Sequence, residues 1–111
     1  MNFEKLEVWK RAARLSAEIY KQTVSLRDFG FRDQITRSGL SVPSNIAEGM
    51  TRDTPKDKRH FITISRSSLA ELRTQIYIGI EIGYLTKDKG QYWIKETEEL
   101  SAMLTGLRNT I

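Results

Sequence analysis

The stretch Gln34–Gly49 reads QITRSGLSVPSNIAEG, an unusual composition for a helix. Apolar side chains recur in it at helical spacing, as at Ile35, Val42 and Ile46. Small residues that form helices poorly lie between them, and such residues let another helix backbone come close. Pro43 lacks an amide hydrogen and clashes with the carbonyl group four residues back, so we expect a bend in the preceding turn. The stretch therefore predicts a kinked core helix packed closely on a neighbour.

Length and composition limit the classes of protein that the chain can belong to. The 111 residues suffice for one domain, 1–111, with one modest core. The absence of cysteine excludes disulfides, thiolate nucleophiles and cysteine–metal sites. We see no signal peptide and no apolar run long enough to span a membrane, so we expect a cytoplasmic protein of bacterial type. The net charge of +4 permits contact with nucleic acid without requiring it.

Four helices are expected to account for almost the whole chain. They span about residues 4–26, 31 to 50–52, 55–83, and from an N-cap at 86 or 88 to 109. Gly30 is expected to take the left-handed conformation that ends the first helix. Thr54 and Pro55 suit the N-cap and first position of the third helix. Loops this short favour an all-α, antiparallel up-down-up-down four-helix bundle.

The first helix has more apolar surface than one neighbouring helix usually covers. Its apolar arc takes up about half of the circumference, so we expect a second subunit to cover part of it. The candidate interface residues are Leu6, Trp9, Ala13 and Tyr20. The opposite face carries bases with acids at helical spacing, which predicts a solvated face that is largely neutralised within the helix. The expected local pairs are Glu7 with Lys10 and Arg11, and Glu18 with Arg14 and Lys21.

Small residues also predict how the second and third helices meet. Counting outward from the tight loop between them pairs Ser41 with about Ser65, and Ser38 with about Ser68. Small residues would then face small residues, which allows a close approach of the two helices.

The same register predicts a structural polar cluster. It places Arg37 near Glu71, and Asn45 near Phe61. We expect a buried or half-buried Arg37–Glu71 ion pair, with Asn45 and Glu48 beside the apolar stripe.

The clearest functional signal lies on the third helix. Arg59, Arg66 and Arg73 are spaced by seven and form one stripe, with Lys56 and Lys58 at the same end as Arg59. None of the three arginines has an acidic residue three or four positions away. The stripe is therefore a candidate phosphate-binding surface, and the alternatives are a solvated face or salt bridges between subunits.

The chain offers little for catalysis. His60 is the one histidine, and an isolated imidazole matches no zinc pattern. Glu48 and Glu71 could form a carboxylate pair, but Arg37 nearby favours ion pairing over acid–base work. No glycine-rich phosphate loop is present. We therefore expect no enzyme, and no catalytic, cofactor or metal site.

Several stretches together resemble a known family. They are FEKLEVW at 3–9, QITR at 34–37, SVPSNIAEG at 41–49, SSLAELRTQ at 67–75 and GYL at 83–85. This combination resembles the four-helix bundle proteins first met in intervening sequences of bacterial 23S ribosomal RNA genes. The chain departs from the usual pattern at Ser67, where glycine is common, and at Arg73, where glutamate is common.

The resemblance implies a four-helix bundle that assembles as a homopentameric ring. It also implies kinship with the accessory variability protein of diversity-generating retroelements, which is basic and associated with nucleic acid and a reverse transcriptase. Two functions follow as expectations. One is a ring that binds RNA or DNA through the phosphate backbone, with affinity that falls steeply as salt is added. The other is a scaffold for a polymerase or an operon partner, whose capture survives nuclease.

Overall fold

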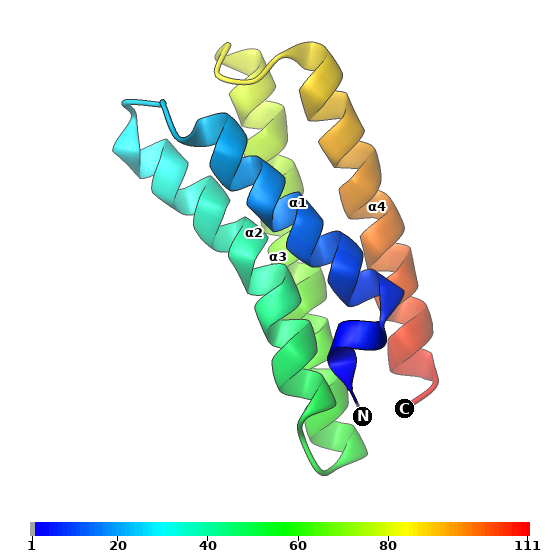
Figure 1. The fold of residues 1–111 in the computed structure, drawn as a ribbon. Helices are drawn as coiled ribbons and strands as arrows, with labels where there is room; N and C mark the ends of the chain where they lie inside the picture. Colours follow the sequence, from blue (N-terminus) through cyan, green and yellow to red (C-terminus); the bar gives the residue numbers. More distant parts are fainter. Residues whose placement is uncertain (1) are drawn as a thin grey trace.

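The computed structural model describes residues 2–111 and contains four α-helices. A short 3-10 helix, η1 (Phe3–Lys5), precedes α1 (Glu7–Thr23), α2 (Phe29–Met50), α3 (Pro55–Glu81) and α4 (Lys87–Asn109). The α1–α2 and α3–α4 connections lie at one end of an elongated bundle, and the α2–α3 connection lies at the other (Figure 1). The bundle measures 43 × 22 × 20 Å. The predicted all-helical fold with four helices is confirmed, and no strand occurs in residues 2–111.

Side-chain caps explain where three of the helices begin. The hydroxyl of Thr54 accepts a hydrogen bond from the Asp57 amide at 3.1 Å, and Pro55 takes the first turn, where its missing N–H costs nothing. Thr86, one of the two expected caps, accepts from the Lys89 amide at 3.2 Å. These two starts agree with the prediction, because a cap depends only on residues within one turn.

The turn before α2 differs from the prediction. Asp28 caps this helix by accepting from the Phe31 amide at 3.1 Å, so α2 begins at Phe29 and already contains Gly30. The prediction that Gly30 is left-handed is therefore wrong. In residues 2–111 a positive φ occurs at Gly83 alone, with a value of 81°, shortly after the end of α3. Leu6 is extended, which separates η1 from α1 and makes α1 shorter than expected.

Helix α2 packs closely on two neighbours through different small residues. A Cβ atom at Gly39 would lie 3.4 Å from the Ile19 Cδ1 atom of α1. Ser41, by contrast, bonds to Ser68 of α3, with 2.8 Å between the hydroxyl oxygens. The expected contact between small residues of the second and third helices is thus confirmed. The helix continues through Pro43 to Met50.

The register between α2 and α3 is offset from the predicted one. Ser41 meets Ser68, which lies three residues further along α3 than the predicted partner Ser65. Ser65 is buried and donates instead to the Val42 carbonyl at 2.9 Å. Residues 51–57 are all exposed, so the first turn of α3 extends beyond the end of α2. Counting symmetrically from the loop missed this overhang.

The core runs the length of the bundle. It comprises Val8, Ala12, Leu15, Ile19, Ile35, Val42, Ile46, Met50, Ile62, Leu69, Leu72, Ile76, Leu85, Trp93, Ile94, Leu100 and Leu104. Trp93 is the largest fully buried side chain, and its indole N–H donates to Glu18 Oε1 at 3.3 Å. A buried indole usually needs such an acceptor, so Glu18 fixes α1 against α4.

Candidate nucleic-acid and subunit interfaces

The arginine stripe lies along α3, but each of its members has a different environment. Arg59 donates to the main-chain carbonyl of Ile111 at 3.0 Å. Arg73 donates through Nε to the Thr97 hydroxyl of α4 at 3.0 Å. Arg66 keeps its Nε buried, with no acceptor in residues 2–111. None of the three forms an ion pair within this part of the chain, so their charge is available to a ligand or another subunit.

The two lysines at the start of α3 differ from each other. Lys58 is half-buried and its ammonium group donates to the Met50 carbonyl at 3.2 Å. A cation at that place satisfies a free carbonyl at the C-terminus of α2 and suits the helix dipole. Lys56 is exposed. Of these two candidates, the structure leaves Lys56 open to solvent and gives Lys58 a structural contact.

A hollow between α3 and α4 contains the middle of the stripe. Its volume is about 300 Å³, and its lining residues are Thr63, Arg66, Ser67, Ala70, Arg73 and Ser101. We call it the α3–α4 hollow. Arg108 of α4 reaches toward its edge and donates to the Thr63 hydroxyl at 3.4 Å. The hollow therefore combines guanidinium groups with hydroxyl groups and holds no carboxylate in its lining.

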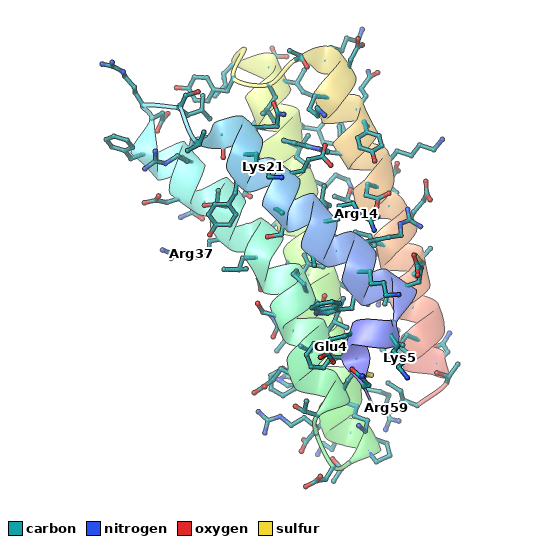
Figure 2. The ribbon with its side chains drawn as sticks, in the orientation of Figure 1. Glu4, Lys5, Arg14, Lys21, Arg37 and Arg59 are labelled. Atoms are coloured by element: carbon teal, nitrogen blue, oxygen red, sulfur yellow. The ribbon has the colours of Figure 1, made fainter. Side chains whose placement is uncertain are left out.

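The predicted polar cluster does not assemble. Arg37 and Glu71 are both exposed and form no ion pair in residues 2–111, and Arg37 points outward from α2 (Figure 2). Glu48 pairs with Arg52, which follows the end of α2, at 2.8 Å. Asn45 donates to the Ser41 hydroxyl at 2.9 Å. The Arg37–Glu71 prediction is wrong because Arg37 lies beside Tyr20 and Leu40, on the α1 side of α2.

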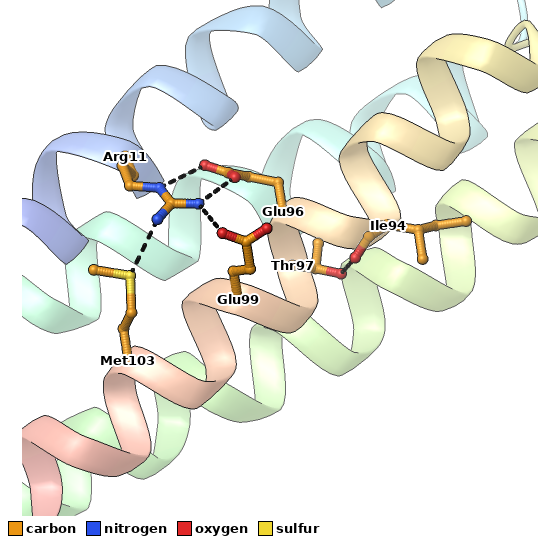
Figure 3. Close-up of polar contacts among 6 residues, drawn as sticks. All are labelled: Arg11, Ile94, Glu96, Thr97, Glu99 and Met103. Carbon is orange, nitrogen blue, oxygen red and sulfur yellow. Dashed lines mark hydrogen bonds and ion pairs between the residues drawn. The ribbon is translucent and has the colours of Figure 1, made fainter.

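The ion pairs that hold α1 in place join it to α4. Arg11 donates from Nε to Glu96 at 3.0 Å and from Nη2 to Glu99 at 2.9 Å (Figure 3). The bonds to Glu96 and then Glu99 raise the pKa of Arg11 above its ordinary value. Glu18 likewise pairs with Lys89 of α4 at 3.1 Å. The predicted neutralisation within the first helix is therefore wrong.

This rearrangement leaves three bases of α1 without ion pairs in residues 2–111. They are Lys10, Arg14 and Lys21, all exposed. Arg14 and Lys21 are visible along the outer side of α1 in Figure 2. Sequence reasoning missed them as candidates because their acidic neighbours at helical spacing were assumed to pair locally. The long side chains of Arg11 and Glu18 reach α4 instead, so the assumed pairs within α1 do not form.

An apolar groove lies between α1 and α2. Its volume is about 460 Å³, and Phe3, Trp9, Ala13, Tyr20, Leu40 and Pro43 are among its lining residues. We call it the α1–α2 groove. Three of the four candidate interface residues line it, whereas Leu6 packs against the core instead. Tyr20 and Leu40 remain 46% and 48% exposed, a large apolar exposure for neighbouring helices of one subunit.

His60 is exposed and sits edge-on to Phe61, with 5.4 Å between ring centroids. Residues 2–111 contain no group of three or more histidine or acidic side chains placed to hold a metal ion. Within the same residues, none of the helices has the length and apolar character needed to cross a membrane.

Known proteins resemble this chain in sequence and in fold. The sequence profile of the 23S rRNA-intervening sequence protein matches residues 4–106. A crystal structure of a protein with unknown function, from the S23 ribosomal protein family of Bacteroides thetaiotaomicron VPI-5482, is 22% identical. It superposes with a TM-score of 0.85 over 91% of this chain and 97% of that chain, so the two share a fold. A comparison with curated proteins finds no match. Because the profile covers far more than half of the sequence, the chain belongs to the 23S rRNA-intervening sequence protein family.

Proposed function

We propose that this protein is a non-enzymatic homo-oligomer that binds RNA or DNA through the phosphate backbone. The observation that carries the proposal is the stripe of Arg59, Arg66 and Arg73, none of which pairs with an acidic side chain in residues 2–111. Guanidinium groups bind phosphate oxygens as a planar fork. Arg59 and Arg73 each use one N–H donor in a hydrogen bond, and Arg66 uses none, so all three have donors free for phosphate.

Further exposed bases support the same function. Lys56 extends the stripe at the start of α3, and Lys10, Arg14 and Lys21 form a second basic strip on α1. Exposed charges of one sign raise the local concentration of a polyanion and speed its association. The net charge of +4 likewise favours the binding of a polyanion.

Assembly of several copies would strengthen such binding. The proposed subunit is an antiparallel up-down-up-down bundle, and a second copy would cover the apolar α1–α2 groove. The family resemblance favours a ring of five. A ring repeats each arginine around its axis. Contacts that are weak one by one then bind a polyanion jointly.

The nucleic-acid proposal is tested by a matched pair of charge reversals. Arg66→Glu alters the stripe, and Arg27→Glu makes the same change of net charge at an exposed position between α1 and α2, outside the stripe and the α1–α2 groove. Binding of mixed-sequence RNA and DNA is measured by fluorescence anisotropy from roughly 50 to 200 mM salt. We expect affinity to fall steeply with salt, and R66E to weaken binding about tenfold more than R27E. Absence of binding at low salt, or equal effects of the two variants, would contradict the proposal.

The assembly proposal has its own matched pair. Leu40 in the groove and Ile78 on α3 are both 48% exposed, so L40E and I78E place a charge at equally accessible positions. Sedimentation velocity gives the mass of each in solution. We expect L40E to dissociate the oligomer and I78E to leave it intact. A wild-type protein that sediments as a monomer at micromolar concentration would rule assembly out.

A second candidate function is a protein-interaction scaffold, with a polymerase such as a reverse transcriptase, or another operon product, as partner. The exposed apolar side chains of Tyr77, Ile78 and Ile82 near the end of α3 favour it. On this alternative, a partner co-purifies with the protein after nuclease treatment and is lost from I78E. The R66E change would then leave the capture unchanged.

A further inference from the structure

Arg66, which lines the α3–α4 hollow, carries an unusual donor. The Nε–H group of Arg66 is shielded from water and has no hydrogen-bond acceptor in residues 2–111. A buried donor without a partner costs free energy, and more so when it belongs to a charged group. Because the Nε–H group is closed off from the hollow, a ligand there meets the Nη groups of Arg66, which form no hydrogen bond in residues 2–111 and favour a ligand with oxygen atoms.

The surrounding side chains are held in place without using all their donors. Arg73 is fixed by its Nε contact to Thr97, and Arg108 by one Nη contact to Thr63. A guanidinium group has five N–H donors, so both retain several. The hydroxyl groups of Thr63 and Ser67 donate to main-chain carbonyls of α3, at 2.9 and 3.2 Å, which stiffens this wall.

The charge of the hollow also selects the ligand. Arg66 and Arg73 line it, Arg108 adjoins it, and no acid is among its lining residues. The acids nearest in sequence on the two helices are Glu71, which is exposed and forms no ion pair in residues 2–111, and Glu99, which pairs with Arg11 of α1 at 2.9 Å. A neutral ligand would leave several positive charges uncompensated, whereas an oxyanion neutralises them and accepts several hydrogen bonds at once.

We infer that the α3–α4 hollow is a binding site for one tetrahedral oxyanion, with Arg66 and Arg73 as its principal ligands. As the source of this group we assign a backbone phosphate of a bound nucleic acid, an assignment that rests on the proposed function. The volume of about 300 Å³ is roughly ten times the space of one water molecule, so a phosphate group fits with accompanying waters.

The test observes the arginine Nε–H groups directly. In ¹⁵N-labelled wild-type protein, the Nε–H signals are followed while inorganic phosphate replaces chloride at constant ionic strength. We expect the Arg66 and Arg73 signals to shift together and to saturate, while the exposed Arg37 stays unchanged. The variant R66K keeps the charge but lacks the planar fork of the guanidinium group, and we expect phosphate to bind it about tenfold more weakly. Small shifts of all arginines without saturation would overturn the site.

A second titration separates the site from the proposed function. It uses a short mixed-sequence single-stranded RNA at low salt, with the same signals observed. Shifts of the Arg66 and Arg73 signals with both phosphate and RNA support both the oxyanion site and the nucleic-acid function. If phosphate saturates the signals and RNA does not bind, the site stands and the nucleic-acid function is wrong. If RNA binds while neither ligand moves Arg66, the site is wrong and the function stands. The wild-type titrations decide these outcomes even if R66K proves unstable.

Discussion

Ser41 of α2 and Ser68 of α3 share a hydrogen bond across the interface of the two helices, with 2.8 Å between their oxygens. Asn45 donates to the same Ser41 hydroxyl at 2.9 Å, so this half-buried polar group is fully supplied with partners. A buried hydroxyl is tolerated only when it is hydrogen-bonded. The pair therefore lets two helix backbones approach closely without leaving a polar group unsatisfied.

Enlarging Ser68 should force α2 and α3 apart. Ser68 is 6% exposed, so S68A loses only the hydrogen bond, which costs about 1 kcal/mol of unfolding free energy. S68L adds volume that the interface cannot accept and should cost about 1–3 kcal/mol beyond S68A. Urea denaturation of both variants measures the difference. Equal stabilities of S68L and S68A would show that the two helices are not closely packed here.

Two helical glycines should respond to alanine in opposite directions. A Cβ atom at Gly49 would lie 3.0 Å from the Phe61 Cβ atom and 3.2 Å from the Lys58 carbonyl oxygen. G49A should therefore destabilise the protein by about 1 kcal/mol or more, despite the higher helix propensity of alanine. Gly106 has no atom within 4 Å of the same position, so G106A should stabilise by up to about 1 kcal/mol. Thermal unfolding distinguishes the two, and stabilisation by G49A would disprove the tight contact.

The contact of Arg11 with Glu96 should couple α1 to α4. The two side chains are 24% and 15% exposed, so water screens them only in part. A double-mutant cycle with R11A, E96A and the double variant should give a coupling energy of about 1 kcal/mol. The coupling should shrink as salt rises from about 0.1 to about 1 M, because part of the interaction is ionic. A coupling energy of zero at low salt would show that the pair does not contribute to stability.

The contact between Asp28 and Tyr84 should make the α2 cap sensitive to pH. The Tyr84 hydroxyl donates to Asp28 Oδ2 at 2.9 Å. The pKa of Asp28 is lowered, first by the Phe31 amide and then by Tyr84, while the bond to Asp28 raises the pKa of Tyr84. Asp28 therefore stabilises the fold above the pKa of an unfolded aspartate, and this contribution is lost as pH falls through its lower folded pKa. Tyr84 stabilises below its unfolded pKa, and that contribution is lost as pH rises through its raised folded pKa.

An NMR titration of the Asp28 carboxyl group checks this in Y84F. We expect the pKa of Asp28 to rise in this variant but to stay below its ordinary value, because the larger contribution from the Phe31 amide remains. An Asp28 pKa that is unchanged in Y84F would show that the two side chains do not interact in solution.

Local signals predicted the helices well, because the interactions that define them lie within one turn. Thr54, Pro55 and Thr86 mark helix starts through bonds to residues three positions away. The contact of small residues on α2 and α3 was also predictable, since Ser41 and Ser68 leave space that only another backbone fills. Gly30 shows the limit of such signals, because glycine fits both a helix end and a helix interior, and the cap of Asp28 decided between them.

Contacts between distant residues were harder to predict. Arg11 meets Glu96 although Glu7 lies one turn away, because the packing of α1 on α4 brings a second, half-buried carboxylate closer. Arg37 was assigned to Glu71 by counting along the helices, but it lies on the side of α2 that faces α1, beside Tyr20 and Leu40. The spacing of Arg59, Arg66 and Arg73 was visible in the sequence, but the unpaired Nε of Arg66 depends on how α3 and α4 pack.

The two tryptophans occupy different kinds of surroundings, and this gives the protein two separate fluorescent reporters. Trp93 is fully buried between helices of one subunit, whereas Trp9 lines the α1–α2 groove. Emission from Trp93 should therefore shift to longer wavelength only when the chain unfolds. Emission from Trp9 should shift when the groove is uncovered, so W93F and W9F variants would separate dissociation from denaturation in a single dilution series.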